Sequence, residues 1–479
     1  MYKITKDLIS KLKYNNIIFC HWKSNLLLKE ALAGHDDLDL LIEKKHINKF
    51  ESTIFDLGFK RATNINLEIQ SVHHFYGHDS ISGALLHLHV YYQIKTGPSW
   101  TKSLRFDFEN HILNNLVIHE SGMPIPEKHI ELVIFVIRIM MKYTKVNEII
   151  LVSKESKRTI KELAYLQKGL DIEKLDLFLK LYFPRISKEF FFRCIEVIKE
   201  DGFLKKIICA RQIKNKVSQY LYQSIVVNLF NNTNQLFYRV FNKYFYKEKK
   251  SLFSGGSLIV IAGLDATGKS TITSDLNKWL GKNFSVIESH FGKPPSTLLT
   301  FPINFLIKII RTRTSLNNDL RSSVKSQNKK QSLIFMLRQL ALAYDRFQLS
   351  KFLWSKSSKG NIILCDRYKS ENFGVMDSKR LMLNNHIGLR KKIILKENSL
   401  YDSIKTPDIL IYLTVPVDVA VERNNLRIKK GKETTSFLKQ RHLENQNLKY
   451  KAKNYFNINT DQDYNIVINQ IKTLIWDNL

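Results

Sequence analysis

Short apolar runs in the second half of this 479-residue chain are typical of buried parallel strands. They cover residues 258–262, 361–366 and 406–413 and contain many β-branched side chains. The first run is followed by residues 272–280, where apolar side chains recur at the spacing of one helix face. Strands that alternate with helices predict an α/β domain with a parallel sheet, which we place at residues 255–479.

The middle of the chain has helical spacing instead. Pro124 and Pro126 precede an acid, an arrangement typical of a helix start, and the mostly apolar stretch 130–143 predicts a largely buried helix. Residues 153–180 and 187–243 continue with helical spacing and few glycines. We therefore expect a helical region without a repeat and without a catalytic pattern.

A charged and then Gly/Ser-rich segment, residues 244–256, predicts a linker directly before the first apolar run. The chain is therefore expected to have three parts. These are an α/β domain at residues 1–120, a helical region with its linker at 121–250, and the α/β domain at 255–479.

Two acidic residues lie in an apolar, strand-like segment near the start of the chain. Asp37 and Asp39 are two positions apart, so both carboxylates are expected on one face of the strand. Two carboxylates on one strand face can hold Mg²⁺ for nucleotidyl transfer. A solvated strand edge with two acids explains the same pattern equally well.

Histidines cluster on a later strand, residues 85–92. His87 and His89 share one face of it, and imidazoles at this spacing can share a metal ion. No ligand-spacing rule is met, so structural histidines with satisfied hydrogen bonds are the favoured interpretation.

The first quarter of the chain resembles a nucleotidyltransferase-like domain found in bacterial proteins. The resemblance rests on His-Trp-Lys-Ser-Asn at 21–25, Asp-Leu-Asp-Leu-Leu at 37–41 and His-Leu-His-Val at 87–90. It departs from that pattern at Lys23-Ser24, where such domains carry Gly-Ser, and the later strand offers histidines in place of a third carboxylate. The resemblance implies a transferase-like domain that is inactive or uses metal differently.

Residues 263–271 contain the phosphate-binding pattern G-x-x-x-x-G-K-S between the first apolar run and its helix. Glycines let the backbone N–H groups turn around phosphate oxygens, and the helix N-terminus adds partial positive charge. Lys269 is expected to neutralise the outer phosphates and the Ser270 hydroxyl to ligate Mg²⁺. The residues predicted to bind ATP here are Gly263, Leu264, Asp265, Ala266, Thr267, Gly268, Lys269, Ser270 and Thr271.

The second apolar run ends in Asp366-Arg367-Tyr368. A carboxylate at the carboxyl end of a strand beside the phosphate loop can hold Mg²⁺ through its water shell, and Arg367 can contact the transferred phosphoryl group. Farther upstream, Arg346 follows Asp345 on a predicted helix and could bind an acceptor phosphate in a bidentate manner. Taken alone, a surface ion pair between Asp345 and Arg346 is the stronger explanation of that dipeptide.

A basic, glycine-broken segment at residues 427–432 follows the third strand. Such a segment can close over ATP as a lid that excludes water. An exposed basic loop explains the same residues equally well.

Together these segments resemble the thymidylate kinase family of nucleoside monophosphate kinases, over roughly the last 225 residues. The matching motifs are Gly263-x-Asp265-x-x-Gly-Lys-Ser-Thr, Asp345-Arg346, Asp366-Arg367-Tyr368, Pro407-Asp408-x-x-Ile-Tyr-Leu and Glu422-Arg423. The resemblance implies a P-loop kinase that uses ATP and Mg²⁺. It implies catalytic roles for Lys269, Asp265, Arg367 and Asp366, magnesium ligation by Ser270 and Asp366, ATP contacts from Arg423 and Arg427, and substrate contacts from Arg346, Tyr368, Ser370 and Phe373.

The chain departs from this family where the acceptor is read. After Asp-Arg-Tyr the family has a Ser and then a Tyr-Gln pair for thymine, whereas residues 369–375 lack the glutamine. Residues 289–295 replace the family's Arg-Glu-Pro-Gly-Gly loop, and residues 297–340 exceed what a compact kinase needs. These departures argue against a strict dTMP site, whereas the resemblance implies dTMP or a related acceptor. A regulatory P-loop NTPase and a repurposed kinase of polysaccharide biosynthesis stay open, whereas no Asn-Lys-x-Asp segment supports a GTP switch.

The net charge of +31 favours polyanionic ligands, nucleic acid or an anionic membrane surface as partners, and a lysine-rich composition with solvated side chains explains it equally well. An ATP-dependent kinase requires no nucleic acid, and the family resemblance adds a homodimer as a candidate assembly. None of the four cysteines forms a C-x-x-C pair, which predicts a cytoplasmic protein without a zinc site.

A membrane span is not expected, because no run of about 18 apolar residues occurs and the first residues lack the apolar core of a signal peptide. Residues 301–311 mix apolar and basic side chains, so peripheral contact with a membrane surface stays open there.

Overall fold

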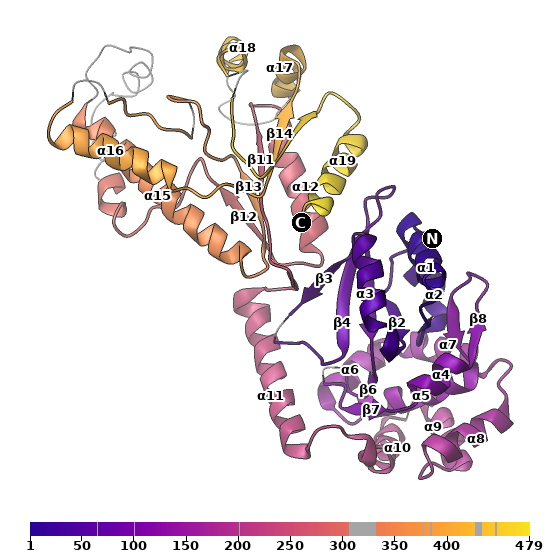
Figure 1. The fold of residues 1–479 in the computed structure, drawn as a ribbon. Coiled ribbons are helices and arrows are strands. Elements are labelled where there is room, and N and C mark those ends of the chain that lie inside the picture. Colours follow the sequence, from indigo (N-terminus) through magenta and orange to yellow (C-terminus); the bar gives the residue numbers. More distant parts are fainter. Residues whose placement is uncertain are drawn as a thin grey trace. The chain divides into compact units, whose positions relative to one another are not determined.

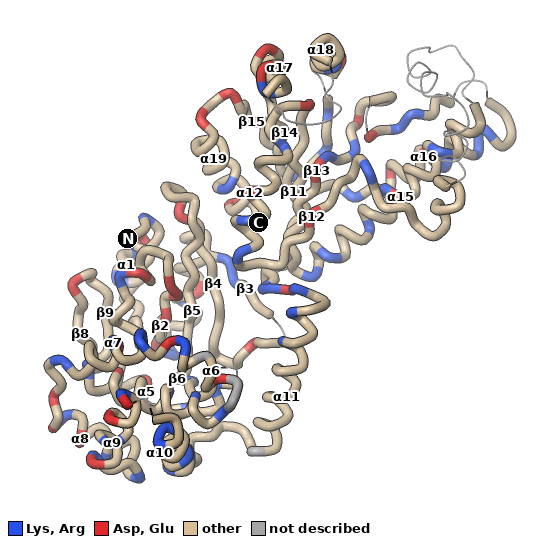
Figure 2. Tube along the Cα trace, turned by 180° about the vertical axis from the view of Figure 1, so that it is seen from behind, with Lys and Arg blue, Asp and Glu red and all other residues tan. Residues whose placement is uncertain are grey.

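A computed structural model describes residues 1–64, 66–99, 101–200, 202–305, 332–375, 377–383, 386–426, 434–445 and 448–479. The chain divides into two units, Met1–Glu248 and Lys249–Leu479 (Figure 1). The division falls inside the segment 244–256 that was predicted as a linker. Lysine and arginine occur throughout both units (Figure 2). None of the helices in the described residues is long and apolar enough to cross a membrane.

The first unit is built on a mixed sheet with the strand order β1-β2-β5-β4-β3. Its strands are β1 (Phe19–His21), β2 (Leu38–Ile42), β3 (Lys60–Thr63), β4 (Val72–His78) and β5 (Leu85–Tyr91). β2 and β5 run parallel, and the other neighbours are antiparallel. Leu38, Leu40 and Ile42 pack on one side with α1 (Lys3–Tyr14) and α3 (Ile47–Asp56).

The opposite side of this sheet packs against α5 (Lys128–Lys142), which is buried along nearly its whole length. The prediction of a buried helix at residues 130–143 is therefore confirmed. One hydrophobic core runs from Cys20 to Val217, so the sheet and the following helices share it. The surrounding helices are α6 (Val146–Lys154), α7 (Ser156–Gln167), α8 (Ile172–Tyr182), α9 (Lys188–Lys199), α10 (Phe203–Lys216) and α11 (Ile225–Phe241).

The start of α5 differs from the prediction. Residues Pro124–Pro126 form strand β9, which pairs with β8 (Leu116–Ile118), and the helix begins only at Lys128 after Glu127 as N-cap. Each proline pushes the preceding residue, Met123 or Ile125, to extended backbone, which explains the strand. The smaller elements of this unit are α2 (Leu28–Leu32), β6 (Ile94–Thr96), β7 (Leu104–Phe106) and α4 (Glu109–Asn114).

The second unit contains an all-parallel sheet with the order β12-β13-β11-β14-β15. Its strands are β11 (Leu258–Gly263), β12 (Val286–His290), β13 (Ile362–Asp366), β14 (Ile409–Thr414) and β15 (Asn454–Asn459), and the short β10 (Ser251–Leu252) precedes them. The three predicted strands and the parallel sheet are confirmed. β12 and β15 were not predicted, because their sequences Val-Ile-Glu-Ser-His and Asn-Tyr-Phe-Asn-Ile-Asn are too polar to show an apolar run.

Helices cover both faces of this sheet (Figure 1). They are α12 (Lys269–Gly281), α15 (Leu333–Ser357), α16 (Leu389–Asp402), α17 (Val417–Leu426), α18 (Thr435–Glu444) and α19 (Tyr464–Asp477). Leu258, Val260 and Ala262 of β11 pack with α15 and α16 in one core. On the other face α12 meets α19, where the ring centroids of Trp279 and Trp476 are 6.3 Å apart. β11 is thus the central strand of a three-layer unit.

Candidate phosphate-binding site

The predicted phosphate loop connects β11 directly to α12. Gly268 is the N-cap of α12 with φ +91°, and Ala266 also has a left-handed φ of +66°. A Cβ on Gly263 would lie 2.5 Å from the carbonyl oxygen of Leu413, which backbone packing does not permit. The glycines of the motif are therefore required by close approach and by backbone conformation. The loop lies at the carboxyl end of the central strand, where open α/β sheets bind ligands.

Lys269 spans the loop that precedes it. Its Nζ donates to the carbonyl oxygen of Leu264 at 2.5 Å, and the hydroxyl of Thr267 donates to the same oxygen at 2.9 Å. Ser270 and Thr271 lie exposed in the first turn of α12. The ammonium of Lys269, the N-terminus of α12 and the exposed hydroxyl of Ser270 thus lie in one loop, which suits the binding of phosphate and its metal ion.

Two arginines surround Asp265 at the same loop. Its carboxylate is 3.3 Å from the guanidinium of Arg367 and 2.7 Å from that of Arg441 on α18. Arg367 itself has a left-handed φ of +67°. The structure therefore brings together the predicted Asp265 and Arg367. Arg441 was missed by sequence reasoning, because it belongs to no motif and lies 176 positions away along the chain.

Asp366 ends β13 and pairs in register with Ile261 of β11, one strand from the phosphate loop. Its Oδ1 is buried and has no hydrogen-bond partner among the described residues. Its Oδ2 is 3.9 Å from Nε2 of His290. A buried carboxylate oxygen without a partner is costly unless a cation or donor joins it, so this acid fits a magnesium ligand.

Arg346 and Asp345 are both buried within α15, at 3% and 2% exposure, so a surface ion pair is the wrong explanation of this dipeptide. Arg346 pairs with Asp377 and donates to Tyr401 Oη at 2.5 Å. Asp345 accepts from the Thr300 hydroxyl at 2.6 Å. Arg346 thus holds elements of the unit together, and its contact with an acceptor phosphate stays a prediction.

Two predicted substrate contacts lie in the interior instead. Tyr368 is 2% exposed, and its hydroxyl donates to the carbonyl oxygen of Lys405 at 2.7 Å. Ser370 is 5% exposed and donates to the carbonyl oxygen of Lys449 at 3.3 Å. Both side chains pack and bond within the unit, and their contact with a substrate stays a prediction. Phe373 is 44% exposed and open to a ligand.

The predicted ATP-side arginines differ in what the structure describes. Arg423 donates to the hydroxyl of Thr460 at 3.1 Å and to its carbonyl oxygen at 2.7 Å. Arg427 and the predicted lid at 427–432 lie outside the described residues, as do residues 306–331. Among the described residues, no group of three or more His, Cys, Asp or Glu side chains could hold a metal ion unaided.

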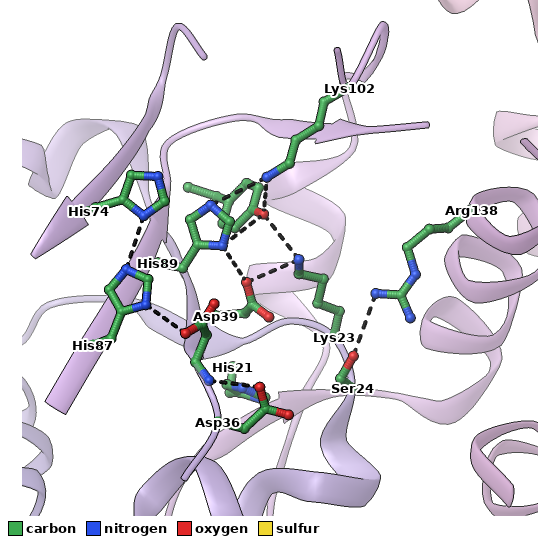
Figure 3. A network of polar contacts seen from close by, with 12 residues as sticks. His21, Lys23, Ser24, Asp36, Asp39, His74, His87, His89, Lys102 and Arg138 are labelled. Atoms are coloured by element: carbon green, nitrogen blue, oxygen red, sulfur yellow. Dashed lines mark hydrogen bonds and ion pairs between the residues drawn. The ribbon is translucent and has the colours of Figure 1, made fainter. Parts of the chain in front are cut away.

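Asp37 and Asp39 point to one face, as predicted, but each contacts a histidine there. Figure 3 shows Asp39 beside His89. Asp37 Oδ1 is 2.6 Å from Nδ1 of His87, and Asp39 Oδ1 is 3.0 Å from Nδ1 of His89 and 3.0 Å from Nζ of Lys23. Burial raises the pKa of Asp39, but the charge of Lys23 and the hydrogen bond from His89 outweigh it and hold that pKa well below its usual range.

The histidines of β4 and β5 stack on one another rather than converge on a common point. The ring of His89 is stacked on that of His74 at 4.6 Å, and His74 Nδ1 lies 3.0 Å from Nε2 of His87. Burial, together with the charge of Lys102, lowers the pKa of His89 to about 3. These contacts favour the interpretation of structural histidines over a shared metal ion.

The phosphate loop between β11 and α12, at the switch point of a parallel sheet and beside Asp366, defines the second unit as a P-loop nucleotide-binding domain. A solved thymidylate kinase from Candida albicans matches at 21% identity and a TM-score of 0.26, over 47% of this chain and 90% of that one. No protein-family model matches the chain.

Curated thymidylate kinases are similar to part of this chain. A thymidylate kinase from Thermosipho melanesiensis is 27% identical over 221 residues, which cover 45% of this chain and 96% of that protein. A thymidylate kinase from Leptospira interrogans is 30% identical over 196 residues, which cover 40% of this chain and 78% of that protein. Over this part of its length, the chain belongs to the thymidylate kinase family. The transferase-like identity of residues 1–120 stays a prediction.

Proposed function

We propose that the unit Lys249–Leu479 transfers the γ-phosphoryl group of ATP to dTMP or a related acceptor. The observation that carries this proposal is the phosphate loop together with the buried Oδ1 of Asp366 one strand away, which has no hydrogen-bond partner among the described residues. Kinship with thymidylate kinases supports the reaction class. Residues 289–295 and 369–375 differ from the family's acceptor-binding sequences, so we do not restrict the acceptor to dTMP.

The residues of this unit divide the task between them. The backbone N–H groups of the loop and the ammonium of Lys269 bind the phosphates of ATP. Ser270 and Asp366 hold Mg²⁺, which neutralises the charge of the phosphates when it is bound. An oxygen of the acceptor attacks the γ-phosphorus in line, and ADP leaves with the bond to that phosphorus broken. No covalent intermediate with the protein is involved.

The arginines near Asp265 act on the transferred phosphoryl group. Arg367 and Arg441 both reach this carboxylate, and such arginines stabilise the charge that spreads over the phosphoryl oxygens. Asp265 positions both guanidinium groups. An NTPase would use the same phosphate loop, but a water molecule would attack the γ-phosphorus in place of the acceptor oxygen.

A second candidate acceptor is a non-nucleotide compound. The observation that favours it is the burial of Tyr368 and Ser370, which follow the Asp-Arg pair and were expected to face the acceptor. A kinase with this core and an altered acceptor side could phosphorylate a sugar of polysaccharide biosynthesis.

The test is ADP release from ATP·Mg²⁺ with dTMP, dUMP, other nucleoside monophosphates, phosphosugars or no acceptor. Lys269→Ala is expected to lower turnover about 100- to 1,000-fold, as for the loss of one strong transition-state donor. Lys278→Ala removes an exposed lysine of the same helix and serves as the matched control. Turnover with no acceptor at the full rate supports the NTPase. Full turnover by Lys269→Ala rejects the site altogether.

A further inference from the structure

The first unit encloses a cavity of about 250 Å³ between its sheet and its helices. Most of its charged lining is basic. The cationic side chains are Lys23, Lys95, Lys102, Arg138, Lys142 and Arg158, and the carboxylates are Asp36, Asp37 and Asp39. They come from the turn after β1, from β2 and the segment that leads into it, from the β6–β7 region, and from α5 and α7. Figure 3 shows Lys23, Lys102 and Arg138 among them.

Each of the three carboxylates already has a cation or imidazole beside it. Asp39 lies between Lys23 and His89, and Asp37 contacts His87. Asp36 Oδ2 is 2.8 Å from the guanidinium of Arg158. The negative charge of the cavity is therefore used within the protein, which makes these acids poor candidates for the magnesium platform predicted from sequence.

Three lysines of the lining, Lys95, Lys102 and Lys142, have no carboxylate partner among the described residues. Lys95 Nζ donates to the carbonyl oxygen of Gln70 at 2.8 Å. Lys102 Nζ contacts only neutral groups, Tyr91 Oη at 2.5 Å and His89 Nε2 at 3.3 Å. Lys142 has no ion pair in the part of the chain that the structure describes. Burial, followed by the charge of Lys23, lowers the pKa of Lys102 well below its usual value. Burial, followed by the charge of Arg138, lowers the pKa of Lys142.

A buried donor of the lining is also unused. Nε of Arg138 is buried and has no hydrogen-bond partner among the described residues, although its other nitrogens reach Ser24 and Glu162. A buried N–H without an acceptor is unfavourable, and crowded cations repel one another. A ligand with several anionic oxygens would accept from the buried N–H and would reduce the repulsion between the cations.

We propose that this cavity binds the phosphate group of a small phosphomonoester, with Lys102, Lys142 and Arg138 as its ligands and without a metal ion. A phosphate offers the oxygens that a guanidinium and two ammonium groups require. A divalent cation would enter a lining in which lysines and arginines outnumber carboxylates, so the charge balance disfavours it.

The remainder of the ligand is inferred from the other lining groups. The described aromatic side chains here, Trp22 and Tyr91, are buried to 1% and 0% exposure and offer no open ring face for a nucleobase. Ser24, Thr96 and Ser99 supply hydroxyl groups instead. The volume lies below the usual range of about 300–1,000 Å³ for ligand pockets. A phosphorylated polyol of hexose size therefore fits better than a nucleotide.

The experiment is calorimetric titration of the full chain carrying Lys269→Ala, which weakens phosphate binding at the loop of the second unit. EDTA is present throughout, and the probes are inorganic phosphate, glucose 6-phosphate and dTMP. We expect glucose 6-phosphate to bind most tightly, and Lys102→Met or Arg138→Gln to weaken it at least tenfold. Lys161→Met changes one exposed lysine of α7 and is expected to leave the affinity within about twofold.

Four outcomes would overturn the proposal. They are no heat with any probe, binding only after Mg²⁺ replaces EDTA, equal losses in Lys102→Met and Lys161→Met, or tighter binding of dTMP than of glucose 6-phosphate. Thermal unfolding of each variant is measured in parallel. If Lys102→Met does not fold, Lys142→Met takes its place, and the same tenfold loss is required.

Discussion

Asp366 of the second unit and Asp39 of the first are both aspartates of a sheet, yet they are in opposite electrostatic states. Among the described residues, Asp366 has a single ion-pair contact, with His290 at 3.9 Å, whereas Asp39 Oδ1 lies 3.0 Å from both Lys23 and His89. The first carboxylate is open to an added cation, and the second is neutralised from within. The same side chain can therefore serve a metal ion or prepare a cavity for an anion, and its neighbours decide which.

The cationic groups of the two regions differ in the same way. In the second unit the phosphate-binding groups belong to one loop, with Lys269 at its end, and backbone N–H groups complete them. In the first unit the cations come from residues as far apart as Lys23 and Arg158, and they meet only in the folded unit. A loop with fixed backbone donors suits a ligand bound through a metal, and a basic cavity suits a ligand bound directly.

The largest expected effect comes from testing Lys269→Ala and Lys102→Met each in both assays, ADP release and glucose 6-phosphate binding. Lys269→Ala should lower ADP release about 100- to 1,000-fold, because the charge on the outer phosphates of ATP is lost, and should leave glucose 6-phosphate binding intact. Lys102→Met should do the reverse. ADP release and calorimetry on both variants measure this. A variant that fails in both assays while still folded would show that the two sites are not independent.

Asp366→Asn tests the open carboxylate. Loss of the charge should weaken magnesium binding, so turnover should fall about 10- to 100-fold and half-maximal rate should require more Mg²⁺. The rate is measured as a function of Mg²⁺ concentration at saturating ATP. Asp418→Asn on α17 is the control, because this exposed acid of the same unit lies in a weak surface pair. An unchanged magnesium dependence in Asp366→Asn would remove this residue from the site.

The sequence sufficed for the phosphate loop because the residues that shape it lie within nine consecutive positions. Backbone conformation at Gly263 and Gly268 is a local property that residue type reveals. The same reasoning missed Arg441, and it did not reveal that Tyr368 is buried, because contact and burial there depend on the packing of distant segments.

The first unit shows the limit more sharply. Alternation along β2 correctly predicted that Asp37 and Asp39 share a face. It could not reveal that Lys23 and two histidines occupy that face, or that Arg138 approaches from a helix about a hundred residues later. A carboxylate pair has the same pattern in sequence whether a metal ion or a protein cation neutralises it, so only the fold distinguishes the two.

Asp39→Asn tests the neutralised carboxylate through stability. Lys23 and His89 lose their charged partner, so the free energy of unfolding should fall by about 1–3 kcal/mol at pH 7. The pKa of Asp39 is lowered in the folded chain. Its contribution is therefore present above the unfolded pKa of about 4 and is lost as the pH falls below it. The difference between wild type and variant should be constant from pH 5 to 7 and shrink toward pH 3.

Urea unfolding followed by circular dichroism at each pH measures this difference. Asp56→Asn, an exposed acid at the end of α3, is the matched control and should change stability by less than about 0.5 kcal/mol. A difference that grows on acidification would mean that Asp39 is not held in its charged form.

Arg441→Gln has the smallest expected effect and tests how the second unit positions its arginines. Asp265 keeps Arg367 when Arg441 is removed, so some of the positive charge near the transferred group is retained. We expect kcat to fall about three- to tenfold with little change in the KM for ATP, because the arginine stabilises charge that develops only during transfer. Arg441→Lys keeps the charge and should recover part of the loss. A change confined to KM would instead mean that Arg441 contacts ATP in the ground state. The phosphate loop would then bind its ligand by direct contact with cationic side chains, as we propose for the basic cavity of the first unit.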